Sequence, residues 1–514
     1  MRGRTTQGPS QQRYTEDTAI PLIDSARPSS APPDRNTTIR AAASTILAQA
    51  MKLALLTVNM AVLGRLLTPA DFGLVALAVS VIGIAELFRD FGLSTAAIQA
   101  KELTAAQHSN LFWLNTVLGG ILCVSVAALA PLVALAFRQP QMVGIVAVLS
   151  LVFLLNGLQT QFQAKLARDF RFNQLAGADV AAQLVGTSVG IAMAVLGAGV
   201  WSLVGMQLAT SGAQLVLRVG LAHWFPGWYR KGQGIGHLVK FGLNLGASQV
   251  LGYVASNAAT IVMGRLETAT VLGYYTRAQQ ISTIPSNQVY FPLTNLIVSR
   301  MAKVHDKQVY KFETGRIAEI SAIFGVSTFI FGATFAEPLV QALLGNQWGP
   351  SIIILQLLCI AGCFQSLTYG YYWMFLILNR TASLLRYNVV TKSALIVAVI
   401  LGAVTYGGVG AAAAQAVVVF VSWPLCCAWL ASDDRIDAIA HMMAGLKLIV
   451  VGSVASTFSL LARILLERLG VGELVGWGSG ATIWFATWSI IMIALYRRTA
   501  IRILNRLSMR RLGN

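Results

Sequence analysis

The stretch GRLLTPADFG, residues 64–73, follows a long apolar run, and two hundred residues later GRLETATVLG, residues 264–273, follows another. The two stretches align without a gap and share five residues, which in the first copy are Gly64, Arg65, Leu66, Thr68 and Gly73. A second, shorter echo links GVWSLVGMQ (199–207) to GVGAAAAQ (408–415). A chain that repeats ordered segments at this distance is predicted to contain two related halves.

The composition places the chain in a membrane. It is 56% hydrophobic and 11% charged, with a mean hydropathy of +0.65, whereas a soluble domain is about 25% charged. Apolar runs of about 20 residues, enough to cross a hydrocarbon layer of roughly 30 Å, recur along nearly the whole length. We therefore expect an all-α polytopic membrane protein.

Apolar windows along the sequence predict fourteen membrane spans. They cover residues 41–63, 72–94, 111–136, 142–163, 176–198, 200–222, 241–263, 271–296, 317–336, 351–377, 385–406, 409–430, 444–463 and 477–496. The repeated stretch follows span one and again span seven, so both copies face the same side of the membrane. This is typical of transporters built from two parallel six-helix halves. We expect two pseudo-symmetric six-helix bundles, with the last two spans outside the repeat.

The positive charges predict the orientation. The net charge is +18, but the 38 Lys and Arg are scattered through short loops and collect at the two ends, so no nucleic-acid partner is expected. With the N-terminus inside, 30 of the 38 lie in the tails and inward loops and five in the outward loops. Cytoplasmic loops carry such an excess of positive charge. Both termini are therefore predicted to be cytoplasmic.

The expected organisation follows from these spans. Residues 1–40 hold Ser, Thr, Pro, Arg and Gln with few apolar residues, so we expect a disordered cytoplasmic tail. After it come an N-terminal six-helix bundle (41–222), a cytoplasmic linker (223–240), a C-terminal six-helix bundle (241–430), helices 13 and 14 (431–496) and a basic cytoplasmic tail (497–514). The five cysteines fall in apolar segments without metal-ligand spacing, so we expect no metal and no cofactor.

The chain also resembles a known family through a run of ordered motifs. The run begins with LGRLLTPADFGLVALAVSVIGIAELFRDFGLSTAAIQAKELT (63–104) and continues through LNGLQTQFQAKLARDFRF (155–172), LGYYTRAQQI (272–281) and EPLVQALLGNQWGP (337–350). These segments resemble the polysaccharide-exporter (Wzx-type) lipid-linked oligosaccharide flippases of the MATE-like (MOP) superfamily.

The resemblance implies a V-shaped transporter of two bundles rather than an enzyme. Such a flippase would move an undecaprenyl-diphosphate-linked oligosaccharide from the cytoplasmic to the outer leaflet of the bacterial inner membrane, for exopolysaccharide, capsule or O-antigen assembly. Its implied partners are this polyprenyl-diphosphate lipid and the membrane lipids, with polysaccharide polymerase and assembly proteins as further candidates.

Ionisable side chains at membrane depth are costly and normally face the interior of a helix bundle. In the first span Gln49, Lys52 and Asn59 share one face, at about 100° per residue. The eighth span repeats these spacings with Arg277, Gln280 and Asn287. The two stripes predict a hydrated cavity in which the two basic residues bind a diphosphate. Hydrogen bonding between packed helices is the alternative, above all for the amides.

Further charged candidates lie nearer the ends of spans. Arg65 and Arg265, the repeated pair, either receive the head group on release or extend toward the membrane interface. Glu86 and Asp90 in the second span are candidates for ion coupling. The alternative is structural pairing of Glu86 with Arg89, three residues away on the same helix.

Two more features fall in the second half. Lys392 in span eleven either joins the cavity or pairs within the second bundle. Pro285 and Pro292 in span eight remove backbone hydrogen bonds, so a kink is expected there.

The sequence is compatible with rival functions. A multidrug or lipid II exporter of the same superfamily would share the fold, although cationic drugs favour buried carboxylates and the central charges here are mostly positive. A membrane glycosyltransferase or polymerase generally has a sizeable outward loop with acidic residues, and the outward loops here are short. A scaffold of polysaccharide assembly would be indicated if Lys52 and Arg277 shared no cavity.

Overall fold

The computed structural model describes residues 35–90, 104–230, 253, 256–290, 293–294, 297–298, 301, 307–378, 380–431 and 437–511. The chain divides into two compact units, residues 1–47 and 48–514. In the first unit the described residues, 35–47, are helical and belong to a helix that begins at Arg35, upstream of the boundary expected at residue 40. The predicted tail otherwise lies outside the described residues.

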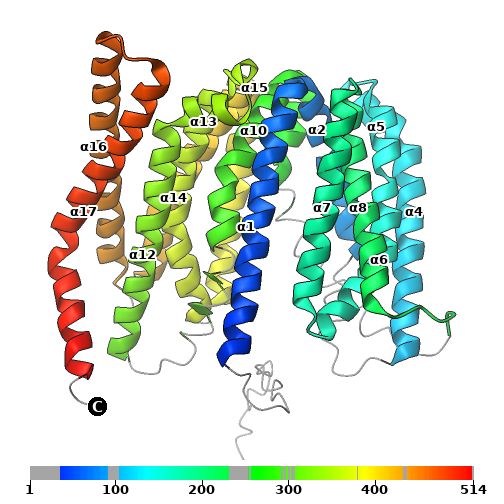
Figure 1. Cartoon of the computed structure of the whole chain (residues 1–514), viewed down its shortest axis with the longest axis horizontal. Coiled ribbons are helices and arrows are strands. Elements are labelled where there is room, and N and C mark those ends of the chain that lie inside the picture. The colour runs from blue at the N-terminus through cyan, green and yellow to red at the C-terminus, as the bar shows by residue number, and fades with distance from the viewer. Residues whose placement is uncertain are drawn as a thin grey trace, which may run out of the picture. The chain divides into compact units, whose positions relative to one another are not determined.

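The regular secondary structure of the described part is helical (Figure 1). The longer elements are α1 (Arg35–Leu66), α2 (Pro69–Asp90), α4 (Ala105–Phe137), α5 (Met142–Leu149), α6 (Leu151–Arg168), α7 (Phe172–Val195), α8 (Val200–Ala222), α10 (Ala269–Pro285), α12 (Lys307–Thr334), α13 (Ala336–Leu343), α14 (Ser351–Ile377), α15 (Thr381–Leu430), α16 (Ala438–Arg468) and α17 (Glu473–Arg511). Two short turns join them, the π-helical η1 (Ser286–Tyr290) and the 3₁₀ turn η2 (Asn346–Trp348).

Ten helices of the described part are long and apolar enough to cross a membrane. One of them, over Ala382–Leu430, is long enough for two crossings. The ten cover all the predicted spans except 41–63, 241–263 and 271–296, and the side chains of these three are described only in part. The expectation of an all-α polytopic protein is confirmed, whereas the count of fourteen stays a prediction.

Helix α15 is two helices joined by a sharp break, which falls at the glycines between the predicted spans 385–406 and 409–430. The backbone leaves the helical region at Tyr406 (φ −136°, ψ 23°) and Gly407 (φ 57°, ψ −138°). A positive φ costs glycine little, because it has no β-carbon. Past the break the two arms pack so closely that a β-carbon on Gly402 or Gly410 would overlap the backbone of the other arm. The predicted spans 385–406 and 409–430 are therefore an antiparallel hairpin.

Helix α10 ends at the proline that the sequence singles out. Pro285 is its last residue, and the chain continues as the π-helical turn η1 rather than as a regular helix. The ring of proline removes a backbone donor and crowds the preceding turn, which accounts for the irregularity. Pro292 lies outside the described residues.

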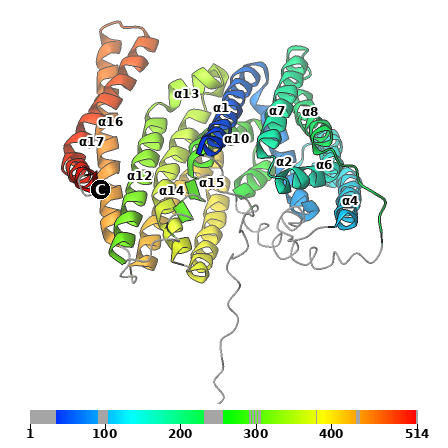
Figure 2. The same ribbon diagram turned by 60° about the horizontal axis from the view of Figure 1, so that its bottom comes forward.

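The helices pack mainly with neighbours in sequence. Helix α4 packs on α6, α7 on α8, α12 on α14, and α14 on α15. The last two helices, α16 and α17, lie side by side, and α16 packs against α12 (Figure 2). The extensive contact between α2 and α10 is different, because it joins segments about 200 residues apart in the sequence. That contact brings the two copies of the repeat together.

Candidate functional site

The two copies of the repeated stretch pack against each other, and each copy places its second glycine against the backbone of the other copy. A β-carbon added to Gly73 on α2 would overlap the carbonyl oxygen of Ala269, where α10 begins. A β-carbon added to Gly273 on α10 would overlap the carbonyl oxygen of Pro69, where α2 begins. Small residues let transmembrane helices approach this closely. The second glycine of each copy is therefore required by the backbone of the other copy.

The threonine of each copy caps the helix that follows it. The Oγ1 of Thr268 accepts a hydrogen bond from the backbone N–H of Val271 at 3.3 Å. In the first copy Thr68 Oγ1 accepts from the N–H of Asp71 at 3.3 Å, and the Asp71 carboxylate accepts from the N–H of Thr68 at 2.9 Å. Both threonines satisfy donors that a helix leaves free at its start. The shared Thr therefore has a local, structural role.

The motif EPLVQALLGNQWGP covers the end of α1. It forms α13 and η2, and the buried indole of Trp348 donates to the carbonyl oxygen of Gly64 at 2.8 Å. The amide of Gln347 donates to the same oxygen at 2.7 Å, and Arg65 donates to the carbonyl of Ala342 at 2.8 Å. The last carbonyls of a helix lack partners within it. This turn supplies those partners from the second half of the chain.

The second echo lies beside the first in both halves. A β-carbon on Gly199 would stand 3.6 Å from a carboxylate oxygen of Asp71. In the second half, Gly407 directly precedes the segment 408–415. A β-carbon on Gly407 would lie 2.7 Å from a carboxylate oxygen of Glu267. Loops that the sequence assigns to the outer side thus lie next to one another, at the end where α2 and α10 cross.

A chain of polar side chains runs through the first half. Asp179 on α7 is its centre and accepts from Arg218 on α8 at 2.8 Å and from Lys52 on α1 at 3.3 Å. The side chain of Arg218 is only 6% exposed, whereas that of Lys52 is 37% exposed. A buried cation needs its charge paired and its N–H groups hydrogen-bonded; Arg218 is bonded through Nη1 and Nη2, while its Nε has no partner in the described part of the chain. Lys52 is thus the accessible end of the pair.

The chain continues from Arg218 onto α6 and α2. The guanidinium of Arg218 also donates to the amide oxygens of Gln159 and Gln163, each at 3.0 Å. The amide nitrogen of Gln159 donates to the amide oxygen of Asn156 at 2.6 Å, and the amide nitrogen of Asn156 donates to a carboxylate oxygen of Glu86 at 2.9 Å. Five helices, α1, α7, α8, α6 and α2, are thereby connected by their side chains.

Glu86 ends this chain as part of an ion pair. Arg89 Nη2 lies 2.9 Å from Glu86 Oε1, and Arg89 Nη1 donates to the hydroxyl of Thr160 at 3.0 Å. The structure therefore contains the structural pairing that the sequence offers as the alternative to ion coupling. The second carboxylate oxygen of Glu86 is buried and has no hydrogen-bond partner in the described part of the chain. The side chain of Asp90 lies outside the described residues.

The predicted stripe on α1 is not uniform. Asn59 is buried and donates to the sulfur of Met206 on α8 at 2.8 Å, and Lys52 reaches α7. Gln49 is exposed. Two members of the stripe thus contact the neighbouring helices of the first half, and the third is exposed.

The predicted stripe on α10 lies at the crossing with α2. The guanidinium of Arg277 stands 3.9 Å over the ring of Phe72 and hydrogen-bonds Gln280 on its own helix. Its Nε is buried without a partner among the described residues. Asn287 in η1 and the repeated Arg265 are exposed. No hydrogen bond or ion pair joins Arg277 to Lys52 in the described part of the chain.

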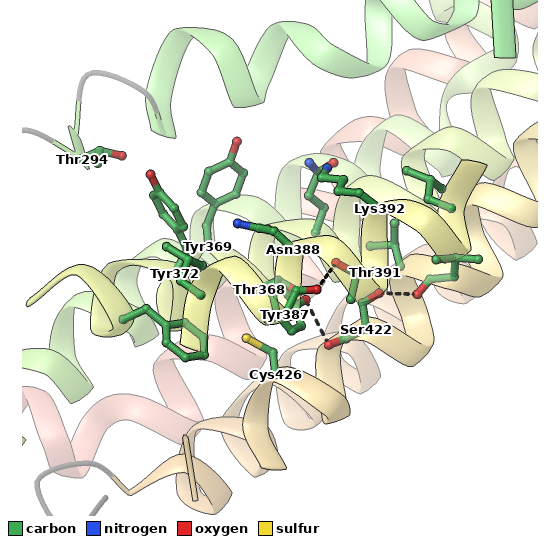
Figure 3. A pocket seen from close by; sticks show the side chains of 16 residues that line it. Thr294, Thr368, Tyr369, Tyr372, Tyr387, Asn388, Thr391, Lys392, Ser422 and Cys426 are labelled. Atoms are coloured by element: carbon green, nitrogen blue, oxygen red, sulfur yellow. Dashed lines mark hydrogen bonds between the residues drawn. The ribbon is translucent and has the colours of Figure 1, made fainter. Parts of the chain in front are cut away.

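The second half holds a cavity of about 370 Å³ between α14 and the two arms of α15, with Thr294 at its edge (Figure 3). Pockets for small molecules span about 300–1,000 Å³. Sixteen residues line it, among them Tyr369, Tyr372, Asn388 and Lys392. The hydroxyls of the two tyrosines, the Asn388 amide and Lys392 lie on the same side of the cavity (Figure 3).

Of the four polar residues on that side of the cavity, the sequence points to Lys392 alone. Lys392 is noticed because it is charged, whereas the tyrosines read as ordinary aromatic core. A usable signal was present, since Leu384, Asn388, Thr391 and Leu395 follow helical spacing around the lysine. The partner stripe on α14 is the segment SLTYGYY (366–372), which is rich in hydroxyl groups for a membrane span. Only the fold shows that the two stripes face each other.

Comparison with known proteins places the chain among polysaccharide biosynthesis proteins. The family with that description matches residues 62–353. The chain is 25% identical over 383 residues to the lipopolysaccharide biosynthesis protein WzxC of Escherichia coli (strain K12), covering 73% of this chain and 77% of that protein. It is 26% identical over 318 residues to the teichuronic acid biosynthesis protein TuaB of Bacillus subtilis (strain 168), covering 60% of this chain and 65% of that protein.

The fold is that of a solved membrane transporter. The lipid II flippase MurJ, in its inward closed conformation, superposes with a TM-score of 0.71 at 11% identity. The superposition covers 90% of this chain and all of that one. The likeness in fold and the apolar helices together make this a multi-pass membrane protein.

Proposed function

Because the chain belongs to the polysaccharide biosynthesis protein family and is a Wzx-type member of the MOP superfamily, we propose that it is a flippase for a lipid-linked oligosaccharide. The substrate is an oligosaccharide carried on undecaprenyl diphosphate. The protein moves it from the cytoplasmic to the outer leaflet of the bacterial inner membrane, where it feeds exopolysaccharide, capsule or O-antigen assembly. Both termini are on the cytoplasmic side in this proposal.

The observation that carries the proposal is the reciprocal crossing of α2 and α10. The repeat puts the same glycine at the same contact in both copies, and Trp348 and Gln347 seal the adjacent end of α1. A contact of this kind at one end of the helices closes that end and leaves the other free to open. Rocking of the two halves that opens this contact and closes the other end gives alternating access.

In the proposed architecture fourteen spans form two six-helix bundles, a V-shaped pair, with α16 and α17 as an addition. The first bundle spans 41–222 and the second 241–430. The cytoplasmic linker 223–240 joins them. The V opens to the cytoplasm in the state where α2 and α10 cross, so the lipid enters from the inner leaflet.

Lys52 and Arg277 are the proposed diphosphate ligands. Lys52 is the accessible member of its ion pair with Asp179, so a diphosphate can compete with that carboxylate for it. Arg277 offers a guanidinium whose Nε has no partner in the described part of the chain, and guanidinium groups bind phosphate through parallel hydrogen bonds. In this proposal the diphosphate binds both Lys52 and Arg277, which no hydrogen bond or ion pair joins to each other in the described part of the chain.

The test is mass spectrometry of the lipids that copurify with the full-length protein. Wild type is compared with the Lys52→Ala, Arg277→Ala double variant. The control is Lys447→Ala, Arg386→Ala, which removes two exposed cations from α16 and α15. We expect a polyprenyl-diphosphate glycan with wild type and control, and its loss from the Lys52, Arg277 variant.

Two results would contradict the proposal in different ways. Bulk phospholipid alone in all three preparations contradicts the substrate class. A diphosphate glycan retained equally by all three contradicts the role of Lys52 and Arg277 but supports the function.

A further inference from the structure

The cavity between α14 and α15 presents polar groups that nothing in the described protein engages. From it we propose a second binding site, one for an acidic sugar unit, such as a hexuronate, of the transported glycan. The inference rests on the proposed flippase function. The site lies apart from Lys52 and Arg277, neither of which lines this cavity.

The aromatic rings of Tyr369 and Tyr372 form part of the cavity wall. Tyr369 stacks on Tyr290 with centroids 4.7 Å apart and an interplanar angle of 8°, so one of its faces is covered. Tyr372 meets Tyr369 edge-on, at 6.2 Å and 85°. An aromatic ring combines an apolar face with, in tyrosine, a polar tip. This suits the C–H face of a pyranose with hydroxyls at its rim.

The amides supply what sugar hydroxyls need. Asn388 and Gln365 line the cavity, and no hydrogen bond engages either side chain within the described part of the chain. Each amide carries two donors and an acceptor, so it can bond two neighbouring hydroxyls at once. Both side chains are only partly buried, so their amides can be reached by a ligand in the cavity. By contrast, Thr391 and Ser422 already donate to backbone carbonyls of their own helices.

The charge of the lining selects an acidic sugar over both a neutral one and a diphosphate. Lys392 is half-buried, and no hydrogen bond or ion pair holds its ammonium in the described part of the chain. It is the sole ionisable Lys, Arg, Asp or Glu among the described lining residues. A single point charge matches one carboxylate. A diphosphate carries more negative charge and is typically held by several cations or by Arg forks.

The position of the cavity fits the loading side. Its lining residues on α14 lie in the part of that helix that leads to its end at Ile377, and those on the first arm of α15 follow its start at Thr381. The predicted topology puts the turn between these helices on the cytoplasmic side. An incoming lipid-linked unit would therefore meet this cavity from the leaflet in which it is made.

The test measures sugar binding to the full-length protein in detergent by saturation-transfer NMR, without transport. The probes are methyl β-glucuronide and methyl β-glucoside, which differ by a carboxylate in place of a hydroxymethyl group. Wild type should prefer the glucuronide by roughly 10-fold, the effect of one charge-assisted hydrogen bond. Lys392→Gln should remove that preference and leave glucoside binding unchanged, whereas Lys392→Arg should keep it.

The controls make the result specific. Lys447→Gln removes an exposed lysine on α16 and should behave as wild type. Tyr372→Ala should weaken both probes equally, because it removes the ring and not the charge. Thermal melting shows whether each variant is folded. If Lys392→Gln is unfolded, the inference is tested by two other results: Lys392→Arg should keep the preference for glucuronide, and Tyr372→Ala should lose affinity for both probes equally.

Three results would overturn the inference. They are equal binding of the two probes by wild type, a preference that survives in folded Lys392→Gln, and displacement of the glucuronide by inorganic pyrophosphate at a lower concentration than by free glucuronate. The last would make the cavity a phosphate site. Because no lipid is moved in this experiment, sugar binding without transport refutes only the proposed function, and transport without sugar binding refutes only this inference.

Discussion

The two halves of the chain share the repeated stretch where α2 and α10 cross, and they differ in the polar residues of their interiors. In the first half the cations Lys52, Arg89 and Arg218 are each paired with a carboxylate, and hydrogen bonds link the pairs through α6. In the second half Lys392 stands beside a cavity with no partner in the described part of the chain. The repeat thus conserves the contact between the halves, while each interior is free to specialise. One interior holds its helices together, and the other has room for a ligand.

Breaking the paired interior should have the largest effect. Arg218→Ala leaves Asp179 and the oxygens of Gln159 and Gln163 without their buried donor. Removing one partner of a fully buried ion pair costs about 3–5 kcal/mol, and we expect the low end of that range here because Asp179 is 25% exposed and keeps Lys52. We therefore expect a large fall in the thermal melting temperature of the detergent-solubilised protein.

The matched change in the other interior is Lys392→Gln. It breaks no pair in the described part of the chain, so stability should stay within about 1 kcal/mol of wild type. Equal losses for Arg218→Ala and Lys392→Gln would remove the contrast between the two interiors.

The shared crossing should show a smaller but definite effect. Gly73→Ala places a methyl group against the carbonyl of Ala269, and such overpacking costs about 1–3 kcal/mol. Gly120→Ala on α4 is the control, because a β-carbon there meets nothing within 4 Å. Alanine is the better helix former, so the control should be neutral or more stable by up to about 1 kcal/mol. The comparison is made by melting temperature, and a Gly73 variant as stable as the control would show that the close approach is not needed.

The general fold was predictable, because its causes are local in the sequence. Apolar length marked the spans, and the glycines at 407 and 408 marked the break in α15. The repeat could be found from five matching residues, but its meaning could not. The aligned letters do not show that Gly73 and Gly273 touch each other's partner helix, which is a tertiary contact.

The partners of the charged residues were the hardest to foresee. The sequence placed Lys52 on an inward stripe, yet its partner Asp179 lies 127 residues away on α7. Arg218 drew no attention because it lies near a span end, where basic residues usually mark topology. The cavity in the second half depends on two stripes from different helices, and neither stripe identifies the other. Pairings of this kind are fixed by packing rather than by spacing.

The central claim is that the crossing of α2 and α10 must open for a lipid-linked glycan to be moved. Its most direct test is a disulfide between Gly64→Cys on α1 and Leu344→Cys after α13, since a β-carbon on Gly64 lies 3.2 Å from the Leu344 Cα. The control, Gly452→Cys with Ile330→Cys, joins α16 to α12, where the β-carbons lie 3.5 Å apart. The control pair has the Cβ separation of a disulfide, and in the test pair Gly64 and Leu344 are in direct contact at the end of α1.

The measurement is flipping of the copurified glycolipid in proteoliposomes, before and after a reductant is added. We predict that the oxidised Gly64, Leu344 protein is inactive and regains activity on reduction, while the oxidised control stays active. Flipping at the wild-type rate by the fully cross-linked protein would contradict the account.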